Sequence, residues 1–262
     1  MRCNCFSRCP ISWRQVRRWQ GDRWHVGRWL VRRWFVLIGC TLALPALAED
    51  DKHFTAVIER AQQLAAEAYH PPEESLPKVL RELDYDTYRQ IRFNPAHAYW
   101  QDESPFSLQL FHSGFLFPTP ITLNVIENDT VTPLPFSAED FSYDGNAAKL
   151  KEHDLTGSGH AGFRLHYPLN SEEYDDEFAV FLGASYFRIV GRNQAYGLST
   201  RELAIDTAST TGEEFPAFRE FWMYKPDADA EHIELLALMD SPSISGAYRF
   251  IIQPGENTQV EV

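Results

Sequence analysis

Cysteine is absent from most of this 262-residue chain, because all four cysteines precede residue 41. The rest of the chain therefore has neither a thiol nucleophile nor the cysteines of a disulfide framework. The histidines are scattered without a His-Glu-x-x-His or comparable spacing, so the sequence predicts no metal site. It also has neither a phosphate-binding glycine loop nor a Gly-x-Ser-x-Gly elbow, which argues against nucleotide-binding and serine-hydrolase functions.

Positive charge is scarce beyond residue 48. Residues 1–48 carry nine Arg and one acid, a charge of +8, whereas residues 49–262 carry 15 basic and 36 acidic residues, a charge of −21. Such an acidic body is repelled by nucleic-acid phosphates and by anionic lipid. The sequence therefore predicts that neither of these is a partner.

The first 48 residues have the pattern of an export signal. An Arg-rich stretch is followed by the apolar run Trp34–Leu44 and by the small-residue sequence Pro45-Ala-Leu-Ala48. The apolar run is shorter than the roughly 20 residues that a stable membrane span needs. We predict an export signal over residues 1–48 that is cleaved after Ala48. An uncleaved anchor is the alternative, and the export route stays open.

A short helical preface begins the acidic body. Apolar residues recur at helical spacing over Lys52–Tyr69, and Pro71-Pro72 ends the pattern. A second short helix is predicted over Pro77–Leu83 with Ser75 as its N-cap, and a third turn over Asp84–Gln90.

From about Ile91 onward the sequence predicts strands. Apolar runs of strand length alternate with Gly, Pro, Asn or Asp clusters at the spacing of a β-sandwich or barrel. No alternation of strands and helices of the βαβ kind is visible. We expect a mainly β body whose strands fall near residues 106–111, 121–125, 161–167, 178–190, 221–224, 233–239, 247–253 and 259–262.

Carboxylates are candidates for glycoside chemistry, which uses two carboxyl groups about 5–9 Å apart. Asp206 lies between small and apolar residues and could serve as a general acid or base; the alternative is an Asp that caps a turn. Glu213 and Glu214 are adjacent, so on a strand they would face opposite ways and supply only part of such a pair. Solvated loop charge is the alternative for Glu213-Glu214 and our preferred interpretation of 175–177.

Aromatic residues interleaved with polar ones are the more distinctive signal. A glycan groove needs aromatic platforms for the C–H faces of sugar rings and hydrogen-bonding groups for the hydroxyl rims, whereas packing between sheets is the alternative for the same residues. Together with the carboxylates, the candidate carbohydrate-binding residues are Tyr186, Arg188, Tyr196, Asp206, Glu213 and Trp222.

Several long motifs are shared with a known family. They occupy residues 83–93, 98–100, 162–170, 176–188, 196–208, 212–216, 221–222 and 239–250. Over essentially all of residues 52–262 the chain resembles the periplasmic glucan biosynthesis proteins, the MdoG or OpgG group. Glu202 departs from this pattern, where the family usually has Gly.

The resemblance implies a periplasmic protein that helps to make osmoregulated β-1,2-linked glucans and whose ligand is β-glucan. It also implies a galactose-mutarotase-like β-sandwich followed by an immunoglobulin-like domain, in proteins much longer than this chain. Some relatives cleave β-1,2-glucan by an inverting mechanism with two Asp residues. That pair would lie beyond Val262, so we expect residues 49–262 to be the N-terminal portion of the sandwich and assign no catalytic residue.

Three functions follow from these expectations. The first is binding or processing of the glucan backbone in the periplasm, without a cofactor. The second is a non-catalytic glucan-binding or scaffold module that partners a membrane glucosyltransferase. The third is an inactive gene fragment. Formation of new reducing ends would support processing, and glucan-induced stabilisation without cleavage would support the module.

Overall fold

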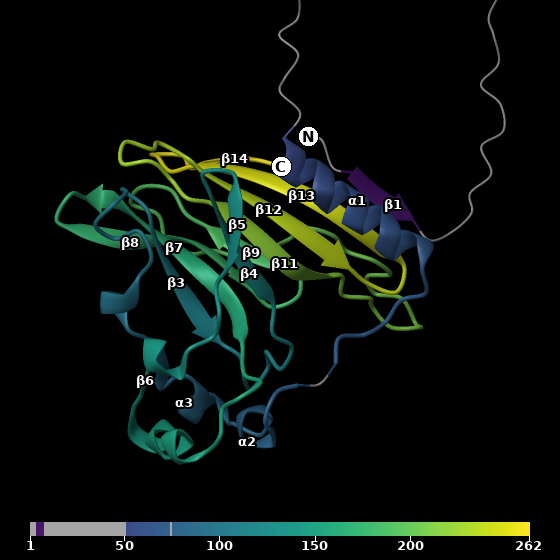
Figure 1. Ribbon diagram of the computed structural model, residues 1–262, viewed down its shortest axis with the longest axis horizontal. Coiled ribbons are helices and arrows are strands. Elements are labelled where there is room, and N and C mark those ends of the chain that lie inside the picture. Colours follow the sequence, from purple (N-terminus) through teal and green to yellow (C-terminus); the bar gives the residue numbers. More distant parts are fainter. Residues whose placement is uncertain (1–3, 8–50, 74) are drawn as a thin grey trace, which may run out of the picture.

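The computed structural model describes Asn4–Ser7 and residues 51–73 and 75–262 (Figure 1). Apart from Asn4–Ser7, the predicted export signal lies outside these residues. In the part of the chain that is described, no helix is both long enough and apolar enough to cross a membrane.

Helix α1, Lys52–Ala66, confirms the predicted preface helix, although it ends three residues before Tyr69. Its N-cap is Asp51, whose carboxylate accepts hydrogen bonds from the backbone N–H groups of His53 and Phe54. These bonds satisfy two of the donors that every helix leaves free at its start.

The remaining helices are short. Helix α2 covers Lys78–Arg81 and α3 covers Tyr85–Tyr88. The predicted Ser75 cap is wrong: the N-cap of α2 is Pro77, whose hydrocarbon ring has no atom that could make a side-chain capping bond. Three 3₁₀ helices follow at Pro95–His97, Ala138–Asp140 and Gly145–Glu152.

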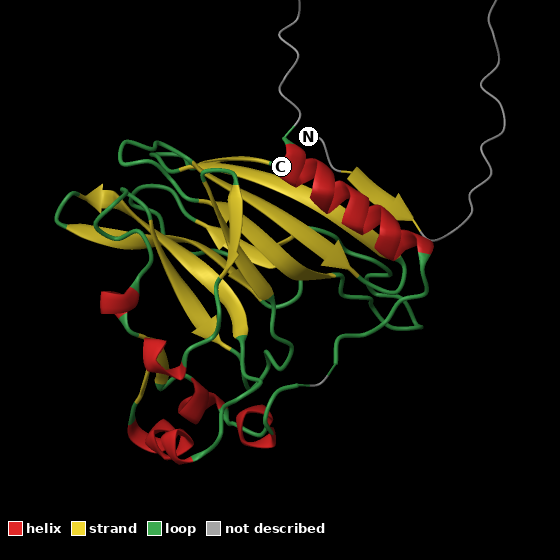
Figure 2. Ribbon diagram, viewed as in Figure 1, coloured by secondary structure: helices red, strands yellow, loops and turns green. Residues whose placement is uncertain are grey.

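Most of the strands form two large sheets, which confirms the mainly β prediction (Figure 2). The seven-stranded sheet has the order β1-β13-β12-β11-β4-β5, with β14 also pairing with β13. Its pairs are antiparallel except for β11 with β4, which are parallel. Its strands are β1 (Asn4–Ser7), β4 (Thr122–Glu127), β5 (Thr130–Pro133), β11 (Ala217–Tyr224), β12 (Ile233–Asp240), β13 (Ile244–Gln253) and β14 (Gln259–Glu261).

The second large sheet is five-stranded and antiparallel, in the order β10-β9-β8-β7-β3. Its strands are β3 (Ser107–His112), β7 (His160–Ser171), β8 (Tyr174–Leu182), β9 (Tyr186–Ile189) and β10 (Thr200–Arg201). The single strand predicted over residues 178–190 is therefore two strands. They are separated at Gly183, whose φ of +78° favours a residue without a side chain. A small separate sheet pairs β2 (Ile91–Phe93) with β6 (Phe141–Tyr143).

The main core lies between the two large sheets. Phe163 of β7 meets Phe221 of β11 edge-on with ring centroids 5.0 Å apart, and Phe181 of β8 meets Phe250 of β13 at 5.4 Å. All four rings are at most 2% exposed. The inner faces of the sheets thus form the continuous aromatic and aliphatic layer that defines a β-sandwich.

A second core lies on the outer face of the seven-stranded sheet, under α1 (Figure 1). Val57 and Ala61 of the helix pack there with Trp222 of β11 and with Leu236 and Leu238 of β12. Strand β12 is therefore buried on both faces. Its apolar run has no clear two-residue alternation for that reason.

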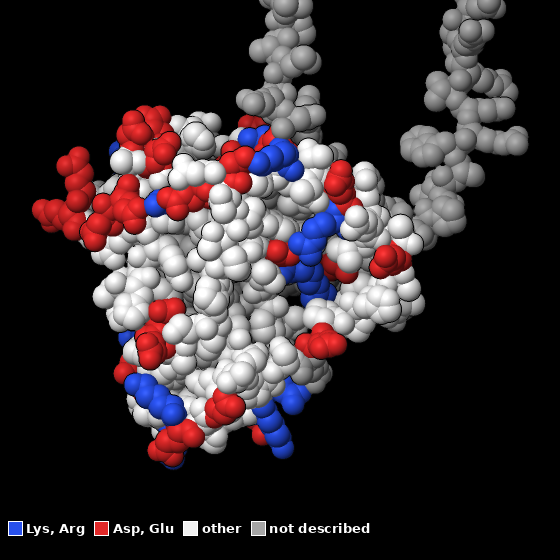
Figure 3. Space-filling model, viewed as in Figure 1, with Lys and Arg blue, Asp and Glu red and all other residues white. Residues whose placement is uncertain are grey.

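Acidic side chains cover part of the surface. Figure 3 shows Asp and Glu gathered at the end of the molecule near β8. The turn between β7 and β8 contributes Glu172 and Glu173, which are exposed. The loop-charge interpretation of residues 175–177 holds for Asp175, which is exposed, whereas the half-buried Glu177 forms an ion pair with Arg164 at 2.9 Å.

Candidate functional site

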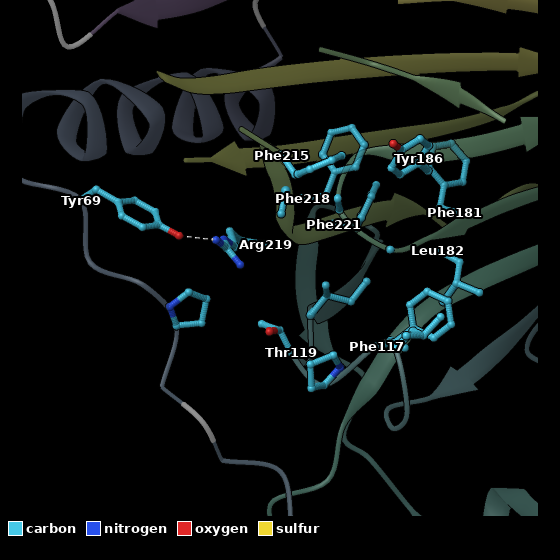
Figure 4. Close-up of a pocket in the computed structure, with 18 residues that line it drawn as sticks. Tyr69, Phe117, Thr119, Phe181, Leu182, Tyr186, Phe215, Phe218, Arg219 and Phe221 are labelled. Atoms are coloured by element: carbon cyan, nitrogen blue, oxygen red, sulfur yellow. Dashed lines mark hydrogen bonds between the residues drawn. The ribbon is translucent and has the colours of Figure 1, made fainter. Parts of the chain in front are cut away.

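A cavity of about 330 Å³ opens at one end of the sandwich (Figure 4). We call it the end cavity. Its walls come from the end of β8, the β8–β9 turn, the segment 116–121, the first half of β11 and the chain just after α1. Segments far apart in the sequence therefore meet at one opening, as is typical of ligand sites built on a rigid scaffold.

Aromatic rings form much of the wall of the end cavity. Phe181, Phe218 and Phe221 are almost fully buried and belong to the sandwich core, whereas Phe215 is 50% exposed and Tyr186 is half-buried at the rim. Phe218 and Phe221 contact each other with centroids 5.0 Å apart. The deep wall is therefore rigid, and the rim offers two ring faces to a ligand.

A hydrogen bond joins the preface to the cavity. The Nη2 atom of Arg219 donates to the hydroxyl of Tyr69 at 2.8 Å (Figure 4). Arg219 is the extra residue of a bulge in β11, since the register with β12 shifts between Phe218 and Glu220. A bulge of this kind redirects a side chain, and here it accompanies an arginine placed at the opening of the cavity.

Arg201 contacts several side chains at the rim beside the cavity. Its guanidinium carbon lies 5.8 Å from the ring centre of Tyr186 and 5.3 Å from that of Phe215. The Nη2 atom forms an ion pair with Glu213 at 2.5 Å, and Thr207 donates a hydrogen bond to the same carboxylate at 3.1 Å. The structure thus brings the predicted residues Tyr186 and Glu213 together through Arg201.

Asp206 lies in the same loop, at a shallow exposed depression that it shares with Glu213. Its φ is +55°, and its carbonyl accepts a hydrogen bond from the N–H of Ser209 at 2.9 Å. Asp is one of the residue types that tolerate this left-handed conformation in a turn. Its backbone therefore shapes the loop beside Glu213.

Arg188 and Tyr196 form a second group on the outer side of the five-stranded sheet. Arg188 is two residues from Tyr186 on β9, so both lie on the face opposite to the buried Phe187. Its guanidinium carbon lies 5.8 Å from the ring centre of Tyr196. The Tyr196 hydroxyl donates to the carbonyl of Glu177 at 2.9 Å, and burial is the main reason that the pKa of Tyr196 is raised.

Trp222 lies apart from the other candidates. It is 8% exposed and packs under α1 on the outer face of the seven-stranded sheet, with the guanidinium of Arg60 5.6 Å from its ring centre. Trp222 is therefore a packing residue, which was the alternative interpretation of the aromatic candidates. The other five candidates lie in or beside the loops and strands near β9.

Sequence reasoning did not single out three polar residues of the site: Tyr69, Arg201 and Arg219. The sequence did contain a signal for Arg201, because this residue is a lone cation in an acid-rich segment that also contains Asp206 and Glu213. No such signal marks Tyr69 or Arg219, whose contact spans 150 positions of the chain. Among the described residues there is no group of three or more His, Cys, Asp or Glu placed to hold a metal.

Comparison with known proteins agrees with the resemblance in the sequence motifs. Residues 53–262 match the family model described as periplasmic glucan biosynthesis protein, MdoG. Proteins named glucans biosynthesis protein G are 48% identical over 207 residues in Ralstonia nicotianae and 44% identical over 209 residues in Rhodopseudomonas palustris. Another, from Vibrio cholerae serotype O1, is 47% identical over 209 residues.

These matches cover 79% of this chain but only 41%, 41% and 38% of the three relatives, respectively. The chain thus spans about two fifths of the length of the relatives it matches. Because the family model matches all residues from 53 to 262, the chain belongs to the MdoG family of periplasmic glucan biosynthesis proteins.

Proposed function

We propose that this chain acts in periplasmic glucan biosynthesis by binding the backbone of a β-1,2-linked glucan at the end cavity. The observation that carries the proposal is the combination of ring faces and cationic hydrogen-bond donors at one opening: Tyr186, Phe215 and Arg219 line the cavity, and Arg201 lies against the two rings beside it. A pyranose ring has an apolar C–H face, which packs on an aromatic ring, and a hydroxyl rim, which accepts hydrogen bonds from a guanidinium group.

The lining of the cavity favours binding over cleavage. None of its described residues is Asp or Glu. Inverting glycoside hydrolysis needs an acid and a base about 6.5–9.5 Å apart on opposite sides of the bond. Glu213 is at the rim, but its carboxylate is held by Arg201 and Thr207. We therefore propose a binding module rather than a glucan-processing enzyme for this chain.

The proposal extends to the place and partners of the module. The relatives are named for glucan biosynthesis and the family for the periplasm, so we propose that residues 49–262 reach the periplasm through the signal in residues 1–48. There the module would receive the growing glucan from a membrane glucosyltransferase. We also propose that it corresponds to the N-terminal portion of the sandwich in longer relatives.

Calorimetric titration with linear β-1,2-linked gluco-oligosaccharides tests the site. We expect saturable binding that Tyr186→Ala weakens about tenfold, because loss of one ring platform removes about 1–1.5 kcal/mol. Tyr174→Ala is the matched control, since Tyr174 is 57% exposed on β8 and is not among the lining residues. Equal affinity in both variants would place the glucan elsewhere.

A reducing-end assay on the same samples separates binding from processing. The binding proposal predicts that oligosaccharides stabilise the protein against heat while no new reducing ends form. Release of reducing ends that Glu213→Gln abolishes would show that the chain cleaves the glucan, contrary to the proposal.

A further inference from the structure

A second groove, distinct from the end cavity, lies between the preface and the five-stranded sheet. It has a volume of about 590 Å³, and its walls include Arg89 and Tyr85 from the α3 region, Arg92 from β2, Phe111 from β3 and Arg164 from β7. We call it the arginine groove. Phe117 and Leu182 line both it and the end cavity, so these two side chains separate the openings.

The arginine groove is positively charged, whereas the body of the molecule is acidic. Residues 49–262 carry a net charge of −21, yet three arginines and no carboxylate are among the described residues that line this groove. Burial lowers the pKa of His112, also in the lining, to about 4, so this imidazole is neutral at pH 7. The positive charge of the groove thus comes from the arginines.

The three arginines differ in what they contact. Arg164 is held in place: its Nη1 atom contacts Glu177 at 2.9 Å, and its Nη2 atom donates to Gln109 at 2.7 Å. Arg89 and Arg92 are exposed, and no ion pair joins either to a carboxylate within the described part of the chain. Elsewhere, cations such as Arg60, Arg201 and Arg249 do pair with Glu.

Aromatic rings lie beside two of these guanidinium groups. The guanidinium of Arg89 lies 5.8 Å from the ring centre of Tyr85, which is 60% exposed, and that of Arg164 lies 5.5 Å from Phe111. Tyr88 is fixed by a 2.7 Å hydrogen bond from its hydroxyl to the carbonyl of His112. Ring faces therefore lie beside the unpaired guanidinium group of Arg89 and beside the ion-paired one of Arg164.

We propose that the arginine groove binds a sugar ring that carries an oxyanion, either a phosphate or a carboxylate. The oxyanion accepts charge-assisted hydrogen bonds from Arg89 and Arg92, whose forked donors match both groups. The ring packs against Tyr85 and Phe111. An uncharged sugar would leave the two guanidinium groups without a counter-charge. The groove therefore discriminates by charge.

Titration of the full chain with glucose 6-phosphate, glucuronate, glucose and inorganic phosphate tests this site. We expect glucose 6-phosphate or glucuronate to bind at least tenfold more tightly than glucose, and the stronger of the two identifies the oxyanion. The double variant Arg89→Gln and Arg92→Gln should weaken that binding at least tenfold. Inorganic phosphate that binds as tightly as glucose 6-phosphate would overturn the role of the sugar ring.

The charge-matched control is the double variant Arg60→Gln and Arg249→Gln. These two substitutions change the net charge by the same amount, but on the α1 side of the molecule. They should change the affinity for the charged sugar by less than twofold. Equal loss in both double variants would show non-specific attraction and overturn the proposal. Tyr186→Ala should leave binding of the charged sugar intact, so that failure of this site and failure of the glucan site can be told apart. Thermal unfolding of each variant checks that it folds.

Discussion

Replacing Trp222 by alanine tests whether helix α1 is part of the folded core. Trp222 is 8% exposed, lies beside Leu236 across the β11–β12 pair, and packs with Val57 and Ala61 of the helix. Truncation would remove the packing of the indole ring against Val57 and Ala61. The sheet cannot close the gap, because its strands are held by backbone ladders on both sides.

The expected loss in the free energy of unfolding is about 3–5 kcal/mol, the usual cost of a large aromatic to Ala change in a core. For a folded unit of this size, each kcal/mol lowers Tm by roughly 2–4 °C, so Tm should fall by roughly 10 °C. Trp222→Phe should lose distinctly less, since a ring still fills part of the space. Glucan affinity should be unchanged wherever the variant remains folded.

Urea unfolding followed by circular dichroism measures the loss without relying on the removed fluorophore. A double-mutant cycle with Val57→Ala adds a sharper test, because residues in contact couple by about 0.5–3 kcal/mol. Tyr174→Ala, exposed on β8, is the control and should change stability by less than about 0.5 kcal/mol. A loss below about 1 kcal/mol for Trp222→Ala, or no coupling to Val57, would refute the packing of α1 on this sheet.

Two further predictions concern stability. An added Cβ at Gly162 would lie 2.1 Å from the carbonyl oxygen of Phe181, so Gly162→Ala should cost about 1–3 kcal/mol or more, whereas Gly197→Ala, with open space around it, should be nearly neutral in the same urea titration. Burial lowers the pKa of His112 to about 4 from 6.5, so the unfolded chain binds this proton first and stability falls as pH drops from about 6.5 to 4. His112 should contribute about 3 kcal/mol of this fall. Burial also lowers the pKa values of His160 and His166, so His112→Gln should make the fall shallower without abolishing it; a His112→Gln profile parallel to that of the parent protein would contradict the assignment.

The strand pattern could be predicted where apolar and polar side chains alternate in the sequence. Residues 106–111 alternate with period two, and β3 lies within one residue of that range. The prediction was less accurate at residues 178–190, where the turn at Gly183 interrupts an apolar run. The two-residue β10 and the fully exposed β5 have too little apolar pattern to be visible.

The candidate site, like the strands, could be predicted from the sequence only in part. Aromatic residues beside polar ones pointed to the region of Tyr186 and Tyr196, where the guanidinium groups of Arg201 and Arg188 lie over their rings. The same pattern at Trp222 marks a core residue, since a ring with a polar neighbour looks alike in sequence whether a helix covers it or not. Only the fold reveals that Tyr69 and Arg219 meet.

The sequence by itself determined four properties: the helical spacing of α1, the mainly β body, the acidic charge of that body and, through long shared motifs, the family. Each of these depends on residues near one another in the chain or on their sum. The tertiary structure decided which face of each strand is covered, that the arginines of the arginine groove lie together without a carboxylate among them, and that the end cavity exists at all. Those properties depend on contacts between residues tens to more than a hundred positions apart, whose geometry no local pattern contains.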